Sequence, residues 1–177
     1  EFLESHLLAL QTEIECWFRQ QWQLTPAPFY ASVDLRNAGF KLAPVDTNLF
    51  PAGFNNLSRA FLPLCVQAAQ AVIEKLQLST SRILLVPENH TRNLYYWESV
   101  ATLCDILQKA GYEVRIGLYP PDLVMPQDLS LPSGHSLLLE PLIREGDCVS
   151  VSDFKPCLIL LNNDLSSGRP PILENLE

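Results

Sequence analysis

The chain has 177 residues, of which 47% are hydrophobic and 18% charged, and its formal net charge is −8. This composition is that of a folded protein with an ordinary core and excludes a disordered chain. The acidic balance argues against a nucleic-acid or anionic-membrane surface, because both need a basic patch. No apolar run reaches the ~20 residues of a membrane span, and the N-terminus lacks the basic region of a signal peptide. We therefore expect a cytoplasmic protein.

Five cysteines and three histidines are scattered along the chain. The cysteine count is odd and there is no CxxC pair, so five free thiols are expected. The histidines lie among unlike neighbours, which argues against a zinc site. No metal is expected within this chain.

Residues 2–22 are predicted to form a helix, because apolar residues recur there at the spacing of one helical face. These residues are Leu3, Leu7, Leu10, Ile14 and Trp17. The sequence TPAP at 25–28 ends the helix, since proline disfavours helical geometry at the residue before it. A second helix is predicted over 58–77, with Ser58 as its N-cap and Pro63 near its first turn. Its predicted apolar face consists of Phe61, Leu64, Cys65, Ala68, Val72 and Leu76.

Residues 82–87, RILLVP, form a continuous apolar run, as expected of a central parallel strand that is buried on both faces. A helix is predicted over 94–110, with Gly111 as its C-terminal stop, and a strand over 112–119. The inward face of this helix is predicted to hold Trp97, Val100, Ala101, Cys104 and Leu107. Strand, helix and strand make a βαβ unit, for which a right-handed crossover is expected.

The remaining chain supplies further strands. Residues 135–143 and 156–164 are predicted to be strands, and the proline-rich residues 120–134 a surface loop. The sequence therefore predicts one α/β domain over 1–177, with a mostly parallel sheet flanked by helices.

The stretch DLRNAGFKLAPVDTNLFPAGFNN, residues 34–56, combines charged and amide side chains with turn formers and aromatics. Apart from a short strand at 29–34, we predict an irregular loop over 29–57. A long loop inside a compact domain is uncommon and usually functional. Phe40 and Phe54 are expected to anchor the loop in the core, while its polar groups face a pocket at the carboxyl edge of the sheet. The alternative is a structural loop whose charges pair with one another.

Two polar loops, ENHTRN at 88–93 and NNDLSSGR at 162–169, follow predicted strands. Ligands of open parallel sheets bind beyond the carboxyl ends of the strands, and an arginine in each loop can grip a carboxylate or phosphate. The alternative is that both are ordinary turns with capping side chains. Neither a GxGxxG nor a GxxxxGK[ST] motif occurs, which argues against a nucleotide-binding Rossmann domain. No GxSxG elbow occurs either, and catalytic residues stay unassigned.

The runs FYASVDLRNAGFKLAPVDTNLFPAGFNNL, residues 29–57, and LLNNDLSSG, residues 160–168, resemble the proteobacterial glutamate–cysteine ligase family of the compact, ATP-grasp-like type. The resemblance covers the whole chain but only the amino-terminal part of a family member. It implies a pre-ATP-grasp-like, Rossmann-like α/β domain. It also implies an activity: glutamate, cysteine and ATP give γ-glutamylcysteine, ADP and phosphate, the first step of glutathione synthesis. ATP and Mg²⁺ are then cofactors of the full-length enzyme, bound downstream of this chain.

Amino-acid substrates are zwitterions, so their site needs cations for carboxylates, and anions or amide oxygens for ammonium groups. Within the matching runs, Arg36 and Lys41 are expected to bind carboxylate, and Asp34 and Asp46 ammonium. The other predicted substrate-binding residues are Asn37, Asn48, Asn55, Asn56, Arg92, Asn163, Asp164 and Arg169.

The expected partners are the small molecules glutamate and cysteine, with no nucleic acid and no membrane; a homo-oligomer is left open. The competing hypothesis is a non-catalytic α/β interaction module, in which residues 34–56 form a structural clasp or a subunit interface.

Overall fold

The computed structural model describes residues 2–88, 92–119, 123–166 and 168–176. It divides into two compact units, Glu1–Pro51 and Ala52–Glu177, which are described separately. The prediction of a single domain stays a prediction. Parts of both polar loops and of the proline-rich loop, namely residues 89–91, 120–122 and 167, lie outside the described residues. Within the described residues, no helix has the length and apolar character needed to cross a bilayer.

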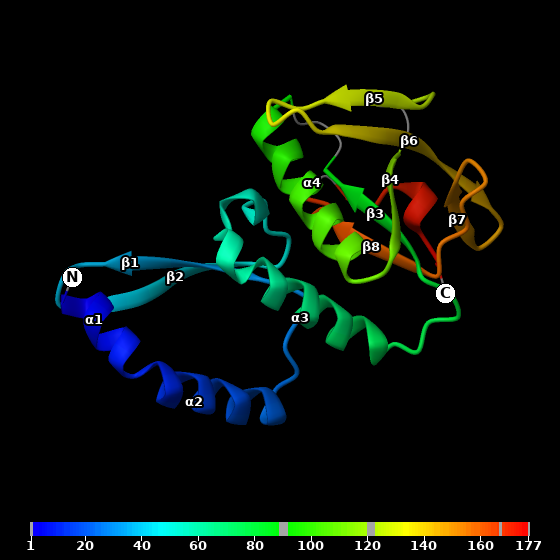
Figure 1. Ribbon diagram of the computed structural model, residues 1–177. Coiled ribbons are helices and arrows are strands. Elements are labelled where there is room, and N and C mark those ends of the chain that lie inside the picture. Colours follow the sequence, from blue (N-terminus) through cyan, green and yellow to red (C-terminus); the bar gives the residue numbers. More distant parts are fainter. Residues whose placement is uncertain (1, 89–91, 120–122, 167, 177) are drawn as a thin grey trace. The chain divides into compact units, whose positions relative to one another are not determined.

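A six-stranded sheet forms the centre of the second unit (Figure 1). Its strands are β3 (Arg82–Pro87), β4 (Glu113–Leu118), β5 (Gln127–Ser130), β6 (Ser136–Glu145), β7 (Cys148–Val151) and β8 (Leu158–Asn162). The order is β5-β6-β4-β3-β8, with β7 paired to β6. The neighbours β6, β4, β3 and β8 run parallel, and β5 and β7 run antiparallel to β6. The predicted α/β class with a mostly parallel sheet is confirmed.

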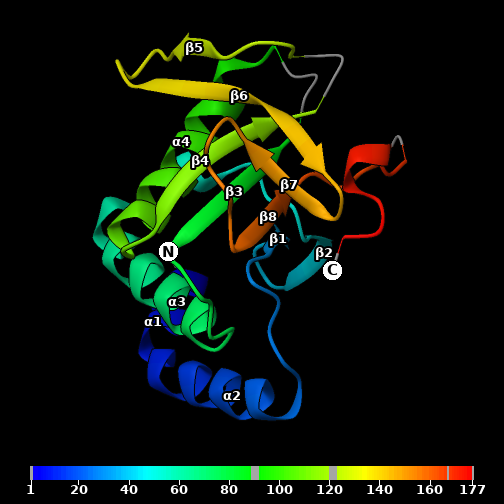
Figure 2. The same cartoon turned by 90° about the vertical axis from the view of Figure 1, so that its right-hand side faces the viewer.

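Strand β3 is the centre of the core. Its residues from Ile83 to Pro87 are buried, as the continuous apolar run predicted. Leu84 and Val86 pack against a cluster that includes Phe154 and Leu173. Helix α4 (Leu94–Lys109) covers the other face, with α3 (Leu62–Glu74) beside it, as Figure 2 shows. Both faces of the central strand are therefore shielded from solvent.

The βαβ unit β3–α4–β4 is confirmed. Four of the five residues predicted to face inward from α4 are buried, and Ala101 is half-buried. The helix ends at Lys109, and Gly111 follows with a φ of +98°, a conformation that glycine adopts at low cost. The Gly111 N–H donates to the carbonyl of Gln108.

Two predictions for the second unit need correction, and one of its strands was missed. Helix α3 is shorter than predicted, because residues 59–61 form the 3-10 turn η2 and the helix ends at Glu74. Phe61 and Leu76 therefore lie outside the helix and are exposed, and Ile73 is its buried residue. The proline-rich segment contains strand β5, because its residues 127–130 pair with β6. Strand β7 was not predicted, since four residues are too few to show a period.

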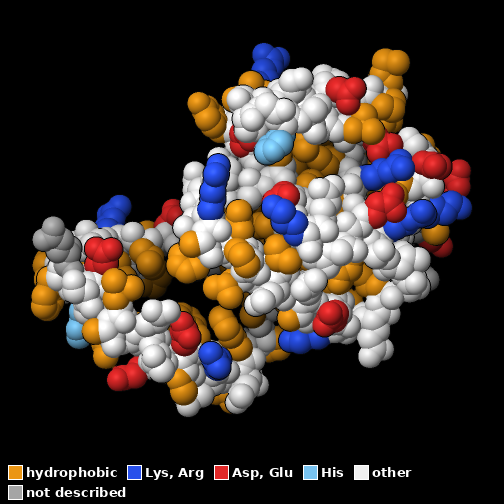
Figure 3. All heavy atoms as spheres, viewed as in Figure 1, with side chains coloured by type: hydrophobic (Ala, Val, Ile, Leu, Met, Phe, Trp, Pro, Cys, Tyr) orange, Lys and Arg blue, Asp and Glu red, His pale blue; other side chains and the backbone are white. Residues whose placement is uncertain are grey.

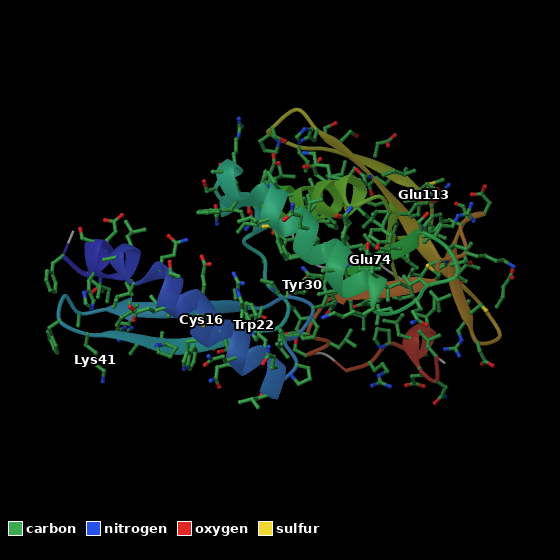
Figure 4. All side chains as sticks on the ribbon, turned by 60° about the horizontal axis from the view of Figure 1, so that its bottom comes forward. Cys16, Trp22, Tyr30, Lys41, Glu74 and Glu113 are labelled. Carbon is green, nitrogen blue, oxygen red and sulfur yellow. The ribbon has the colours of Figure 1, made fainter. Side chains whose placement is uncertain are left out.

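In the first unit, the predicted helix over 2–22 is two helices, α1 (Phe2–Ala9) and α2 (Gln11–Leu24). The break falls at Leu10, whose φ of −98° and ψ of 8° leave the helical region. Neither glycine nor proline occurs at this position, so the sequence pattern did not predict the helix break. Helix α2 ends before Thr25, as the following prolines predicted. Figure 4 labels Cys16 and Trp22 on α2.

The irregular loop predicted over 29–57 is wrong, because residues 32–48 form an antiparallel hairpin of β1 (Ser32–Asn37) and β2 (Leu42–Asn48). Gly39 turns the chain with a φ of +85°, and its N–H donates to Asn37 Oδ1 at 2.8 Å. Pro44 is tolerated because both strands of a two-stranded sheet are edge strands. The register shifts at Asp34/Leu35, which leaves Val45 as a bulge.

The expected aromatic anchors are corrected as well. Phe40 lies in the hairpin turn with 91% of its surface exposed, so it anchors nothing in a core. Phe54 belongs to the second unit and is half-buried in the 3-10 turn η1 (Phe54–Asn56), which contacts α4.

Candidate functional site

An open polar pocket of about 440 Å³ lies where β3 ends and α4 begins. Its lining residues are Ala52, Asn55, Asn56, Glu88, Asn93, Tyr95 and Tyr96. The carboxyl ends of parallel strands are where open α/β sheets bind ligands. We call this the β3–α4 pocket.

Tyr96 holds the Glu88 side of the pocket in place. Its hydroxyl accepts the Glu88 N–H at 2.8 Å and donates to the Asn162 carbonyl at 3.5 Å. Burial is the main cause that raises the pKa of Tyr96 to about 12, so the phenol stays neutral at physiological pH. The residue thus joins the end of β3 to the end of β8.

The other side of the pocket is held by α4. Asn93 caps the helix, because its side chain accepts the Tyr95 N–H at 3.0 Å. The buried Ser99 hydroxyl accepts the Phe54 N–H at 3.1 Å. This bond fixes the start of η1 against α4 and places Asn55 and Asn56 in the wall of the pocket.

The pocket combines one carboxylate with several amides. Glu88 is half-buried and can accept from an ammonium group, and the amides of Asn55 and Asn56 can accept or donate. Arg92, adjacent to the capping Asn93, is exposed and does not line the pocket. These groups could accept hydrogen bonds from a small polar ligand that carries a positive group.

Asn55 and Asn56 are the predicted substrate residues that the structure places in this pocket. Asn163 lies at the same edge of the sheet but is buried, with its amide bonded to neighbouring groups. Asp164 accepts the Ser166 N–H at 2.8 Å in a turn. Arg169 lines a different groove, beside β7 and β8. The side chains of Asn163 and Asp164 thus hold the turn after β8, and a substrate-binding role for them stays a prediction.

The predicted residues in the first unit share one hairpin. Directly paired residues place their side chains on the same face, so the pairs Asp34/Asp46 and Ser32/Asn48 lie on one face together with Arg36. Asn37 lies on the opposite face, and Figure 4 shows Lys41 at the tip of the hairpin. All six predicted residues are exposed. Their role in binding substrate stays a prediction.

Sequence reasoning missed Glu88, Asn93, Tyr95 and Tyr96 as pocket residues. Glu88 and Asn93 could have been predicted from the sequence, because Glu88 directly follows the apolar strand and Asn93 is a typical N-cap residue. Tyr96 gave no such signal, since it looks like any aromatic residue on a buried helix face.

Metal-binding chemistry has no candidate among the described residues, where no group of three or more His, Cys, Asp or Glu side chains could hold an ion. The five cysteines are free, as predicted. The β3–α4 turn contains no glycine in its sequence. The expectation that ATP and Mg²⁺ bind downstream of this chain stays a prediction.

A mostly parallel sheet flanked by helices, with a polar pocket at its carboxyl edge, defines an α/β protein. The family model described as glutamate-cysteine ligase matches residues 4–177, and the chain belongs to that family. The chain is also similar to a solved crystal structure from Methylobacillus flagellatus KT, titled "Putative gamma-glutamylcysteine synthetase", with 57% sequence identity and a TM-score of 0.88. The match covers 99% of this chain but 42% of that one, so the chain spans less than half of its relative. A search of curated proteins gave no match.

Proposed function

We propose that this chain is the amino-terminal, substrate-binding part of an ATP-dependent glutamate–cysteine ligase, which makes γ-glutamylcysteine from glutamate and cysteine. The family match over residues 4–177 is the observation that carries the proposal. The β3–α4 pocket supports it with a carboxylate and amides suited to the ammonium end of an amino acid.

We propose further that ATP and Mg²⁺ bind outside this chain. Phosphoryl transfer needs a phosphate cradle and metal ligands, and the described residues offer neither. More than half of the Methylobacillus relative lies outside the matched region, which leaves room for a nucleotide-binding part. The role of this chain is then to hold an amino-acid substrate.

We expect isothermal calorimetry of this chain to show binding of glutamate or cysteine and no binding of ATP. Glu88→Gln should weaken the amino-acid affinity at least about tenfold, because it removes the charge that faces the ammonium group. The matched control is Glu74→Gln, the same change on the exposed surface of α3 (Figure 4), which should leave the affinity unchanged. Equal effects of the two changes on the amino-acid affinity would show that the β3–α4 pocket is not the binding site.

We expect the chain alone to have no ligase activity. Incubation with glutamate, cysteine and Mg-ATP should release no phosphate above background, because phosphoryl transfer needs a phosphate cradle and metal ligands, which we place outside this chain. A phosphate-release assay with a complete family member as positive control makes the measurement. Clear turnover by the 177-residue chain would show that it holds its own nucleotide site.

A further inference from the structure

The β1–β2 hairpin has an apolar face whose side chains are about half exposed. Val33 and Leu35 lie on this face, opposite Thr47 and Pro44, and are 49% and 58% exposed. Figure 3 shows hydrophobic side chains open on the surface of the first unit. An isolated two-stranded hairpin is at best marginally stable in water, and further strands stabilise it.

The two edges of the hairpin differ in their ability to accept another strand. The Ala38 N–H donates to the Lys41 carbonyl across the turn. Backbone N–H and C=O groups alternate in direction along a strand. The backbone groups of Asp34 and Arg36 therefore face β2, and those of Val33, Leu35 and Asn37 face outward. On β2 the outer edge is interrupted by Pro44, which has no N–H, and by the bulge at Val45. The open edge of β1 is the one suited to pairing.

We propose that β1 pairs antiparallel with β1 of a second copy of this chain, about a two-fold axis at Leu35. In this register each Leu35 lies opposite Leu35 of the other copy, and their outward backbone groups bond to one another. On the polar face, Asp34 of each copy lies opposite Arg36 of the other. The result is a four-stranded sheet. One face carries the Asp34–Arg36 pairs, and the other joins the two Leu35 side chains, with Val33 of each copy opposite Asn37 of the other.

Charge selects this register over its neighbours. A two-fold axis at Asp34 places Asp34 opposite itself, and an axis at Arg36 places Arg36 opposite itself, and like charges directly opposite one another are destabilising. A shift by a single residue brings the charged side chains of Asp34 and Arg36 opposite apolar ones, because the side-chain period of a strand is two. Of the three axes compared, the axis at Leu35 is the one that forms two ion pairs and brings Leu35 against Leu35.

The dimer also relieves a repulsion within the hairpin. Asp34 and Asp46 are directly paired across β1 and β2, with both side chains exposed. Pairing brings Arg36 of the second copy next to this acidic pair. The inference is independent of the proposed ligase function, because it uses no residue of the β3–α4 pocket.

The test is the mass of the protein in solution. Sedimentation velocity and light scattering should show a concentration-dependent species at twice the chain mass of 19.9 kDa. Arg36→Asp replaces both ion pairs by like-charge pairs, so it should weaken dimerisation about 100-fold, at roughly tenfold for each pair. Lys41→Asp makes the same charge change at the hairpin tip, outside the paired residues, and should leave dimerisation within about threefold of the native value.

A charge exchange makes the test specific. The double variant Asp34→Arg with Arg36→Asp restores opposite charges across the axis and should recover the dimer, even if the single variant has lost its hairpin. A substrate-binding role for these residues predicts no such recovery. The proposal is overturned if the native chain is a monomer at every concentration, if Arg36→Asp and Lys41→Asp act alike, or if the double variant stays monomeric.

Discussion

Replacing Arg115 by alanine is expected to lower the free energy of unfolding by ~3–5 kcal/mol. Its partner Glu140 on β6 is 2% exposed. The Glu140 Oε1 atom accepts from Arg115 at 3.4 Å and from the Ser152 hydroxyl at 2.8 Å. Oε2 of this carboxylate is buried without a hydrogen-bond partner in the described structure. Removal of Arg115 leaves a buried carboxylate without its cation, which is far costlier than the loss of a surface ion pair.

Arg82 provides the matched control. Both guanidinium groups lie over the ring of Phe154, at 5.5 Å for Arg82 and 5.0 Å for Arg115. Arg82 also forms an ion pair with Glu113, but both of its members are about half exposed. Arg82→Ala should therefore cost no more than ~1 kcal/mol beyond the lost ring contact. If urea denaturation gives the same loss of unfolding free energy for Arg115→Ala and Arg82→Ala, the burial of Glu140 does not add to the cost of losing its cation.

The parts of the fold that the sequence predicted well are those where one strong pattern dominates. The run RILLVP has no polar residue between its ends, and this pattern fits a strand that is buried on both faces. The helix over 94–110 combines an apolar face with a glycine stop, and its bounds were correct within one residue at the C-terminus. In both cases the burial of apolar side chains and the local backbone preferences favour the same element, so the sequence pattern matches the folded structure.

The hairpin was missed although its signal is present. In β1, Val33 and Leu35 alternate with Asp34 and Arg36, which is the period of a strand with one polar face. The prediction of an irregular loop gave more weight to the nearby glycines and prolines than to this alternation. Both residue types are compatible with a short exposed hairpin. Exposure of the apolar face removes the burial contrast on which such predictions depend, and the same reason explains the error about Phe40.

The candidate site was predictable to the level of loops but not of side chains. The sequence pointed to the edge of the sheet and to the loop that follows β3, and the structure has a polar pocket there. That this pocket binds a ligand stays a prediction. Which polar side chain faces the pocket depends on tertiary hydrogen bonds, and sequence does not show these. Asn163 is the clearest case, since the sequence suggested a substrate ligand and the structure shows a buried amide bonded to neighbouring groups.

Asn163→Ala is expected to lower the free energy of unfolding by about 3 kcal/mol, at roughly 1 kcal/mol for each of three hydrogen bonds. The side-chain oxygen accepts the Leu165 N–H at 2.9 Å. The side-chain nitrogen donates to the Pro87 carbonyl at 3.4 Å and to the Tyr119 hydroxyl at 3.3 Å. One buried amide thus ties together the carboxyl ends of β8, β3 and β4, and its loss leaves buried polar groups without this partner.

Asp164→Ala is the neighbouring control, because Asp164 is exposed and bonds within its own turn. Its cost should stay within ~0.5–1 kcal/mol. Thermal unfolding and glutamate calorimetry on both variants separate the two roles of Asn163. A structural tie predicts a lower Tm for Asn163→Ala, with binding retained in the molecules that stay folded. An unchanged Tm with lost amino-acid binding would instead make Asn163 the substrate ligand that its sequence position suggested.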